Sequence, residues 1–289
     1  MVEVGDLLLA MYGATSGDIA VSKIKGAINQ AILCIRTKQN KKFIESVWNK
    51  HVSKNLRKYL QGGQGNLSAD IVKGISFFFP TLKEQEKIAN LVSLLDERIA
   101  TQTKIIDKLQ SLIKGIAQKI VRSNKPNVRL TECMECKSST LQESEVCEQG
   151  TYPVYGANGI VGYLDNYNTE GEAVYIIKDG SGVGTVSYVT GKCSATGTLN
   201  TLQAKEGYSL QYLYYLLKVF NFEPYKTGMA IPHIYFKDYG KAKVFCPSYT
   251  EQLQYARLLS AIESNLSIEM NILTNLSLQK QYLLRQMFI

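Results

Sequence analysis

The chain has 289 residues, of which 45% are hydrophobic and 20% charged, and its formal net charge is +8. This length and composition are typical of a globular protein with room for two domains. No stretch reaches the roughly 18 consecutive apolar residues of a membrane span, and the first residues lack the pattern of a signal peptide, so we expect a cytoplasmic protein without a membrane partner.

The positive charge is concentrated in the first part of the chain. Residues 1–128 contain 20 Lys and Arg against 10 Asp and Glu, whereas residues 129–249 contain 10 against 12 and residues 250–289 three of each. An excess of basic residues indicates a polyanionic partner such as nucleic acid. Any nucleic-acid contact made by the second part must therefore depend on a local patch.

Residues 1–80 consist of short β-branched runs separated by Gly, Asn and Thr turns. The runs Asp6–Met11 and Ala31–Ile35 predict strands, and residues 41–60 predict a helix. We expect Lys54, Arg57 and Lys58 to form a solvated face of that helix, with phosphate contact as the alternative.

Residues 81–122 predict one long helix. Apolar residues recur there at alternating intervals of four and three, which is the heptad pattern of a helix that packs along a single seam. A helix over residues 84–121 would be about 57 Å long. The seam positions are Ile88, Val92, Leu95, Ile99, Gln102, Ile106 and Leu109, followed by Ile113, Ile116 and Ile120.

Residues 123–128 predict a linker, and residues 129–247 return to short strands and turns, with strands at Ala173–Ile177 and Thr185–Val189 and a helix at 209–220. Residues 248–289 predict a second long helix. Its seam positions are Leu259, Ile262, Leu266, Glu269, Leu273 and Leu276, with Tyr255 before them and Lys280, Leu283 and Met287 after them.

The chain contains an internal repeat with a constant offset of 167 residues. Pro80, Glu84, Gln85 and Ala89 correspond to Pro247, Glu251, Gln252 and Ala256, and Gly13 and Gly17 correspond to Gly180 and Gly184. Both seams also place a polar residue at the same position, Gln102 and Glu269. We therefore expect an α/β (α+β) domain repeated in tandem, each copy followed by a long helix. The two helices should pack as an antiparallel coiled coil whose polar layer fixes their register, with two independent core helices as the alternative; Lys280 is the seam residue that fits least well.

Few residues suggest catalysis. The sequence has no phosphate-binding loop of the Gly-x4-Gly-Lys type, no histidine placed as the base of a triad, and no carboxylate cluster with nuclease-like spacing. The glycine run 179–184 precedes a predicted strand rather than a helix, so we interpret it as a hairpin turn, with a nucleotide-binding loop as the alternative. Cys133 and Cys136 have the spacing of a zinc knuckle, but no second pair follows, and we expect reduced thiols and no metal site.

The two upstream segments carry polar side chains suited to a DNA duplex. Amides can read adenine through two hydrogen bonds, while lysines and hydroxyls contact phosphates or base edges. For any single residue a solvated turn position is the alternative. The candidates in the first segment are Tyr12, Thr15, Ser16, Lys23, Lys25, Asn29 and Gln30, and those in the second are Tyr155, Asn158, Lys178, Ser181, Lys192, Thr196, Thr198 and Asn200.

This arrangement resembles the specificity (S) subunit of Type I restriction–modification enzymes. The resemblance covers essentially the whole chain and depends on the two Pro-x-x-x-Glu-Gln helix openings and the long helices that follow them. The segments 5–17, 62–67 and 228–233 are also similar to that family's target recognition domains.

The resemblance implies two target recognition domains, each reading one half of a bipartite double-stranded DNA site. It implies that the long helices separate the two domains and bind the methyltransferase (modification) subunits, and that restriction (motor and nuclease) subunits join the same complex. It also implies a subunit with no activity or cofactor of its own, because S-adenosylmethionine, ATP and magnesium would belong to the partner subunits.

One feature departs from that pattern. The second recognition domain begins near Arg129, whereas the offset of 167 pairs Met1 with Asn168, so the first domain has no counterpart of residues 129–167. We therefore expect a partial first recognition domain at 1–80 that does not bind DNA unaided. The alternative function is a truncated or silent specificity cassette that acts as a scaffold or recombination partner and reads no DNA.

Overall fold

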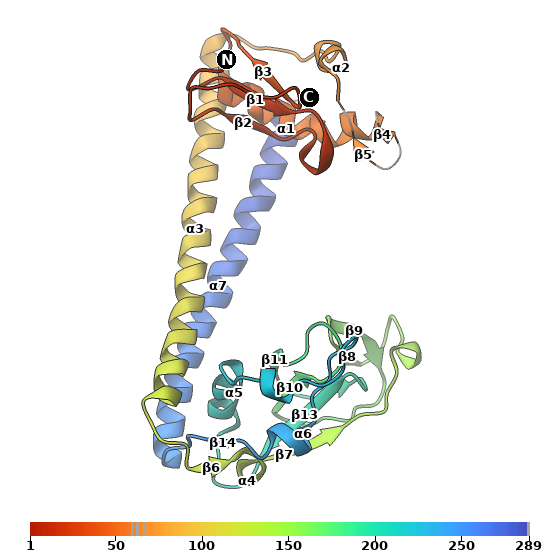
Figure 1. Ribbon diagram of the computed structural model, residues 1–289, viewed down its shortest axis with the longest axis vertical. Coiled ribbons are helices and arrows are strands. Elements are labelled where there is room, and N and C mark those ends of the chain that lie inside the picture. Colours follow the sequence, from red (N-terminus) through yellow and green to blue (C-terminus); the bar gives the residue numbers. More distant parts are fainter. Residues whose placement is uncertain (59, 62–63, 66, 288–289) are drawn as a thin grey trace. The chain divides into compact units, whose positions relative to one another are not determined.

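The computed structural model describes residues 1–58, 60–61, 64–65 and 67–287, with side chains outside 53–66. Contacts divide the chain into two compact units (Figure 1). Unit 1 comprises Met1–Ile106 and Ile268–Ile289, and unit 2 comprises Asp107–Ser267. Each of the two long helices contributes one part to each unit.

Unit 1 contains a small antiparallel sheet with the strand order β2-β1-β3. Alternate residues of β1 are buried because one face of the sheet packs on α1, whose Trp48 donates a hydrogen bond to the Gly17 carbonyl at 2.7 Å. The core also contains Leu9, Met11 and Leu67. The elements are β1 (Leu7–Ala10), β2 (Ile19–Val21), β3 (Ile32–Ile35), α1 (Lys41–Lys58), β4 (Leu60–Gln61), β5 (Gln64–Gly65) and α2 (Ala69–Lys73), with a 3-10 turn at Gly13–Thr15.

Unit 2 contains a four-stranded sheet, β11-β10-β13-β7, a three-stranded sheet, β12-β8-β9, and a short pair, β14-β6. Strand β10 is buried along its whole length because it lies between two cores. The strands are β6 (Val128–Arg129), β7 (Met134–Ser138), β8 (Tyr152–Gly156), β9 (Gly159–Leu164), β10 (Ala173–Ile177), β11 (Val186–Val189), β12 (Ser194–Ala195), β13 (Leu199–Ala204) and β14 (Lys243–Val244). The short helices are α4 (Leu130–Cys133), α5 (Leu210–Lys218) and α6 (Phe236–Tyr239), and 3-10 turns cover Glu143–Glu145 and Glu223–Tyr225.

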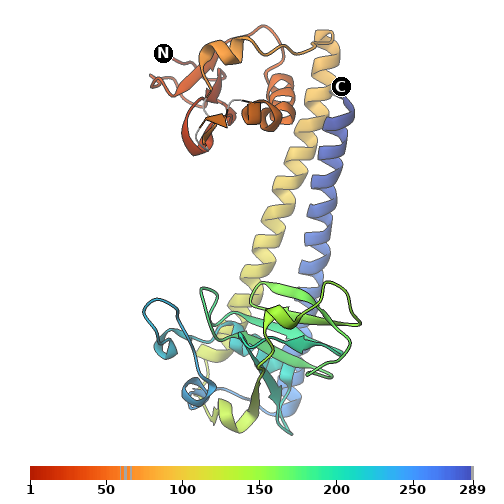
Figure 2. The ribbon, with the colours of Figure 1, turned by 90° about the vertical axis from the view of Figure 1, so that its right-hand side faces the viewer.

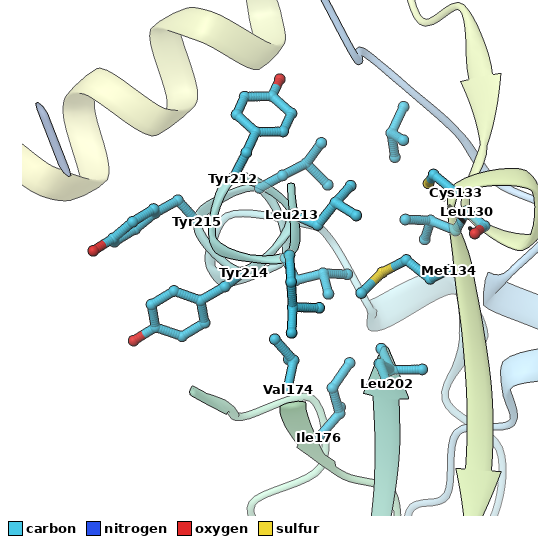
Figure 3. Close-up of a cluster of buried hydrophobic side chains, with 14 of the residues drawn as sticks. Leu130, Cys133, Met134, Val174, Ile176, Leu202, Tyr212, Leu213, Tyr214 and Tyr215 are labelled. Carbon is cyan, nitrogen blue, oxygen red and sulfur yellow. Dashed lines mark hydrogen bonds between the residues drawn. The ribbon is translucent and has the colours of Figure 1, made fainter. Parts of the chain in front are cut away.

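The larger core of unit 2 forms between α5 and the four-stranded sheet. Figure 3 shows Leu213 pointing toward Leu130 and Met134, above Val174, Ile176 and Leu202 of the sheet. Tyr214 and Tyr215 lie on the other side of α5 and donate hydrogen bonds to Glu263 at 3.0 and 2.7 Å. Helix α5 is therefore held by an apolar face on one side and by hydrogen-bonded tyrosines on the other.

The sequence repeat is a structural repeat with the same register. Leu7 pairs with Val21 and Ile35 in unit 1, and Val174 pairs with Tyr188 and Leu202 in unit 2, an offset of 167 at every position. Residues outside the strands keep the offset too, since Leu67 donates to the Met11 carbonyl and Ile234 to the Lys178 carbonyl. The strands and helices expected from the sequence in both segments are present.

The long helices are α3 (Leu82–Arg122) and α7 (Tyr249–Met287), and both begin in the same way. Thr81 and Glu84 form a reciprocal cap at the start of α3, and Ser248 and Glu251 form its counterpart at the start of α7. The glutamate of each Glu-Gln pair therefore satisfies backbone groups at the helix start.

The glutamine of each pair ties its helix to the domain before it. Buried Gln85 accepts from the Asn40 amide at 3.1 Å and donates to the Pro80 carbonyl at 2.8 Å. Buried Gln252 accepts from the Ser209 amide at 2.9 Å and donates to the Pro247 carbonyl at 2.9 Å. Asn40 and Ser209 directly precede α1 and α5 and are 169 residues apart, so the offset shifts by two residues at the starts of these two short helices.

The helices pack antiparallel along the expected seams within each unit (Figure 2). Val92, Leu95 and Ile106 are buried, and Ile99 and Leu109 are half-buried. In α7 Leu259 is buried, and the seam residues from Ile262 to Leu276 are half-buried. The fold class expected from the sequence is confirmed, whereas the domain boundaries 1–80, 81–122, 123–128, 129–247 and 248–289 stay predictions.

The polar positions of the seam bind one another. Gln102, 8% exposed, donates hydrogen bonds to the carbonyl and the carboxylate of Glu269. Lys280, which fitted the seam least well, pairs with Asp96 of α3, and Asp96 also accepts from Lys42 of α1 at 2.8 Å. The seam lysine is thus balanced by a carboxylate.

Candidate nucleic-acid interface

Each unit presents a glycine-bordered turn at the end of its central hairpin. In unit 2 the turn joins β10 to β11, and Gly180 and Gly184 adopt φ values of 99° and 90°. The corresponding Gly13 and Gly17 in unit 1 adopt 80° and 92°. Positive φ favours glycine because other residues are strained there. The interpretation of residues 179–184 as a hairpin turn is confirmed, since the chain continues into β11 and not into a helix.

A second hairpin of unit 2, residues 227–233, lies against this turn. Thr227 and His233 exchange backbone hydrogen bonds, and Gly180 donates to the Pro232 carbonyl at 3.0 Å. The His233 ring is hydrogen-bonded to the Asp179 carboxylate, with 2.7 Å between Nδ1 and Oδ1. At the hairpin tip, Met229 is fully exposed and Ile231 is largely exposed. The two loops therefore form one ordered, solvent-facing surface.

The candidates proposed for unit 2 differ in their exposure. Asn158, Ser181 and Lys192 are exposed, and Tyr155, Lys178 and Thr198 are half-buried. Lys192 lies over the Tyr167 ring, 4.8 Å from its centroid, and its ammonium is 3.7 Å from the Glu170 carboxylate. Its charge is therefore already partly compensated within the unit.

Two candidates of unit 2 are buried. Asn200 is 3% exposed, accepts a hydrogen bond from Ser138 at 3.1 Å and donates one to the Tyr239 hydroxyl at 3.3 Å. Thr196 is 1% exposed, and its hydroxyl is 2.8 Å from that of Thr198. Both side chains are satisfied inside the unit, so we withdraw them from the candidate interface. The partners of Asn200 are distant in sequence, so spacing alone does not reveal them, whereas the partner of Thr196 is only two residues away.

The candidates of unit 1 also differ in their exposure and in whether they have hydrogen-bond partners. Tyr12, Thr15, Lys23 and Gln30 are exposed. Three others have partners within unit 1: Ser16 donates to the Met11 carbonyl at 2.9 Å, Asn29 accepts from the Ala31 amide at 3.0 Å, and Lys25 pairs with Glu3 at 3.0 Å. Ser16 and Asn29 thereby stabilise turns, and Lys25 forms an exposed ion pair. Helix α1 is described as far as Lys58, but the side chains of Lys54, Arg57 and Lys58 lie outside the described residues, as do Gly62, Gly63 and Asn66 of the segment 62–67.

Unit 2 also contains a polar groove of about 910 Å³ that the sequence did not indicate. Its walls come from β7 and the loop after it, from the loop between β9 and β10, and from single residues of β12 and β13. Lys137, Ser138, Gln142 and Asn166 supply donors and acceptors of the kind that read base edges or phosphates. The lining residues run from Lys137 to Thr201, and they are brought together by the pairing of β7 with β13 and by hydrogen bonds from Asn168 to Ser139 and Ser194.

The cysteines do not form a metal site among the described residues, where no group of three metal-ligating side chains occurs. Cys133 is buried in α4, and burial raises the pKa of the Cys136 thiol to about 11. A thiol with a raised pKa is a poor metal ligand, because zinc binds the thiolate.

In the described part of the chain no helix is both long and apolar enough to cross a bilayer.

Comparison with known proteins identifies the family of this chain. A sequence profile of the Type I restriction modification DNA specificity domain matches residues 2–111 and 123–278, which is most of the chain and both repeats. The chain belongs to this family. Each match of the specificity domain includes one sheet with its glycine-bordered turn and part of one long helix.

Individual relatives agree with the specificity-domain assignment. The EcoprrI type I restriction enzyme specificity subunit of Escherichia coli is 26% identical over 117 residues, which are 40% of this chain and 29% of that protein. The chain therefore matches less than a third of that relative's length. The crystal structure of a Type I restriction–modification S subunit from Mycoplasma genitalium has a TM-score of 0.70 at 18% identity, covering 99% of this chain and 83% of the other. A structure described as showing complex assembly of the type I restriction–modification system has a TM-score of 0.60 at 16% identity, covering 99% and 82%.

Proposed function

We propose that this specificity-domain protein recognises double-stranded DNA for a Type I restriction–modification system and leaves the chemistry to partner subunits. The observation that carries the proposal is the repeat: two specificity domains share one scaffold but present different side chains from the same turn. Tyr12, Thr15 and Ser16 stand in one copy where Asp179, Gly182 and Val183 stand in the other. Two recognition domains with the same scaffold but different surfaces are suited to a DNA site with two unlike halves.

In unit 2 we assign DNA contact to the turn 179–184, the hairpin 227–233, the turn between β8 and β9, and the polar groove. Asn158, Ser181, Lys178 and Gln142 supply the polar groups, and sequence specificity would come from contacts to base edges. Because residues 129–249 carry slightly more acidic than basic residues, general electrostatic attraction contributes little here. Readout by unit 2 should therefore depend more on hydrogen bonds than on charge.

We further propose that the long helices bind methyltransferase and restriction subunits. In unit 1 they expose apolar side chains outside the seam, among them Leu94 and Ile272, which line a shallow groove together with Glu97, Arg98 and Thr101. Exposed apolar residues on a helix pair already satisfied along its seam are typical of a protein interface. S-adenosylmethionine, ATP and magnesium would then be bound by those partners.

The test is methylome sequencing of a host that expresses this chain with its co-encoded methyltransferase. A bipartite modified sequence should appear only when the chain is present. The double variant Asn158→Ala with Ser181→Ala should relax one half of that sequence and leave the other unchanged. The control variant is Lys241→Ala, an exposed lysine outside the proposed surface.

A complex that forms but modifies no site would favour the alternative, in which the chain is a scaffold or silent cassette. Modification that is unchanged in the double variant would contradict the assigned surface. A rise in melting temperature on adding ATP or S-adenosylmethionine to the isolated chain would contradict the absence of a cofactor site.

A further inference from the structure

The two units differ at the segment that precedes each long helix. In unit 2 this segment contains β14, which pairs with β6: Val244 pairs with Val128, and Lys243 with Arg129. Asn127 extends the pairing, since its amide donates to the Val244 carbonyl and its side chain bonds both backbone groups of Cys246. Leu130 adds a bond from its amide to the Ala242 carbonyl at 3.1 Å. The backbone of residues 242–246 is thus covered by residues 127–130.

The corresponding segment of unit 1 is open. At the offset of 167, Val244, Phe245 and Cys246 correspond to Phe77, Phe78 and Phe79. Within the described part of unit 1, residues 76–79 belong to no strand, and Phe77 to Phe79 form no backbone hydrogen bond. Phe78 is 93% exposed and Phe79 is 43% exposed. An extended segment with free backbone groups can accept an added strand.

An apolar groove lies beside this open segment. It has a volume of about 740 Å³ and is lined by Phe43, Val47, Phe77, Phe78 and Met287, among others. In unit 2 the corresponding space is filled by the chain itself. Leu130, Cys133 and Met134, which directly follow β6, are at most 1% exposed there (Figure 3). The second unit therefore shows what kind of segment fits the first.

We propose that the groove of unit 1 is a strand-acceptor site for an extended segment from outside these 289 residues, with the chemistry of Asn127–Met134. That chemistry is an asparagine able to bond backbone on both sides, followed by apolar residues at the positions of Val128, Leu130, Cys133 and Met134. The added strand would pair with residues 75–79 while its apolar side chains cover Phe77 and Met287. Main-chain bonds would give affinity, and the apolar side chains would give selectivity. The proposal does not depend on DNA binding.

The experiment uses the full chain and a fluorescein-labelled peptide with the sequence of residues 123–138. Fluorescence anisotropy should show saturable binding of one peptide per chain. Phe78→Glu should weaken the binding at least tenfold, because it places a charge in the apolar groove. The matched control is Ile24→Glu, since Ile24 is also a largely exposed apolar residue of unit 1 but does not line the groove. A control peptide with Asp in place of Val128 and Leu130 should not bind.

Hydrogen exchange locates the bound peptide. The amides of residues 75–79 should gain protection, and those of residues 242–246 should not change. The proposal would be overturned if the peptide failed to bind, if Phe78→Glu bound it as tightly as the unchanged chain, or if protection appeared in residues 242–246, which would mean exchange into unit 2. Concentration-dependent dimerisation abolished by Phe78→Glu would overturn it in favour of a second copy of this chain as the occupant.

Discussion

Single carboxylates at matching positions anchor each long helix to the short helix of the preceding domain, α1 for α3 and α5 for α7. Asp96 and Glu263 are 167 residues apart, yet they bind different partners: Asp96 accepts from Lys42 and Lys280, and Glu263 from Tyr214, Tyr215 and Lys218. Burial opposes the ionisation of Glu263, but hydrogen bonds from Lys218 and Tyr215 outweigh it and hold the pKa of this carboxyl below its ordinary value. The ionised form therefore contributes to the stability of unit 2.

Glu263→Gln should destabilise the protein by about 1–3 kcal/mol at pH 7, because Lys218 and two tyrosines lose a charged acceptor. A carboxyl with a lowered pKa stabilises the fold above its unfolded value of about 4.3, and the contribution is lost as pH falls through the lower folded value. The difference between the variant and the unchanged chain should therefore shrink below about pH 4. Urea denaturation followed by circular dichroism at pH 7 and pH 3.5 measures this difference in the free energy of unfolding. Exposed Glu206→Gln is the control and should change little; a difference independent of pH would contradict the ionic role.

At the scale of elements, the helix pair combines an apolar seam with one polar layer. The side chain of Gln102 is buried and donates hydrogen bonds across the seam to Glu269. A polar pair in an apolar seam weakens packing but disfavours other registers, since any shift leaves both groups without partners. The layer stands at the same repeat position in α3 and α7, which is the geometry expected for antiparallel helices related by the repeat.

Gln102→Leu should destabilise the chain by about 1–2 kcal/mol, because the Glu269 carboxylate then faces an apolar seam without a donor. Replacing both residues by leucine should restore most of the loss. A double-mutant cycle with urea denaturation gives the coupling free energy, expected between about 0.5 and 3 kcal/mol. Strictly additive losses would mean that the two side chains do not depend on each other.

At the scale of the whole molecule, the seam satisfies only part of the apolar surface of the long helices. Leu94 is 59% exposed and Ile272 is 40% exposed, and both belong to the half of the helix pair that lies in unit 1. Under the proposed function, DNA recognition and complex assembly would use different parts of the chain. Loops and grooves would bind DNA, and helix faces would bind partner subunits.

Leu94→Glu together with Ile272→Glu should reduce recovery of the co-encoded methyltransferase in a pull-down at least tenfold. Both side chains are exposed, so the fold should persist, and the melting temperature of the isolated chain checks this. The control is Ile24→Glu, which places a negative charge at another exposed apolar position of unit 1 and should leave recovery of the methyltransferase unchanged. If the double variant recovered the methyltransferase fully, the docking face would have to lie elsewhere.

The sequence by itself determined the architecture of this protein. A hydrophobic period of 3.5 residues specifies a long packed helix, and a constant offset of 167 requires two copies of one scaffold, so the strands, hairpin turns and helix seams followed from local patterns. Lys280 was the exception, because its partner Asp96 lies 184 residues away in the chain.

Only the tertiary structure decided which polar residues face solvent. Asn200 and Thr196 have the composition of base-reading residues, yet their partners Ser138, Tyr239 and Thr198 hold them inside unit 2. The polar groove and the strand-acceptor groove were not predicted from the sequence, because the walls of each come from elements distant in sequence. Periodicity reports how one element alternates between core and solvent, whereas a site depends on which elements meet, and long-range pairing alone sets that.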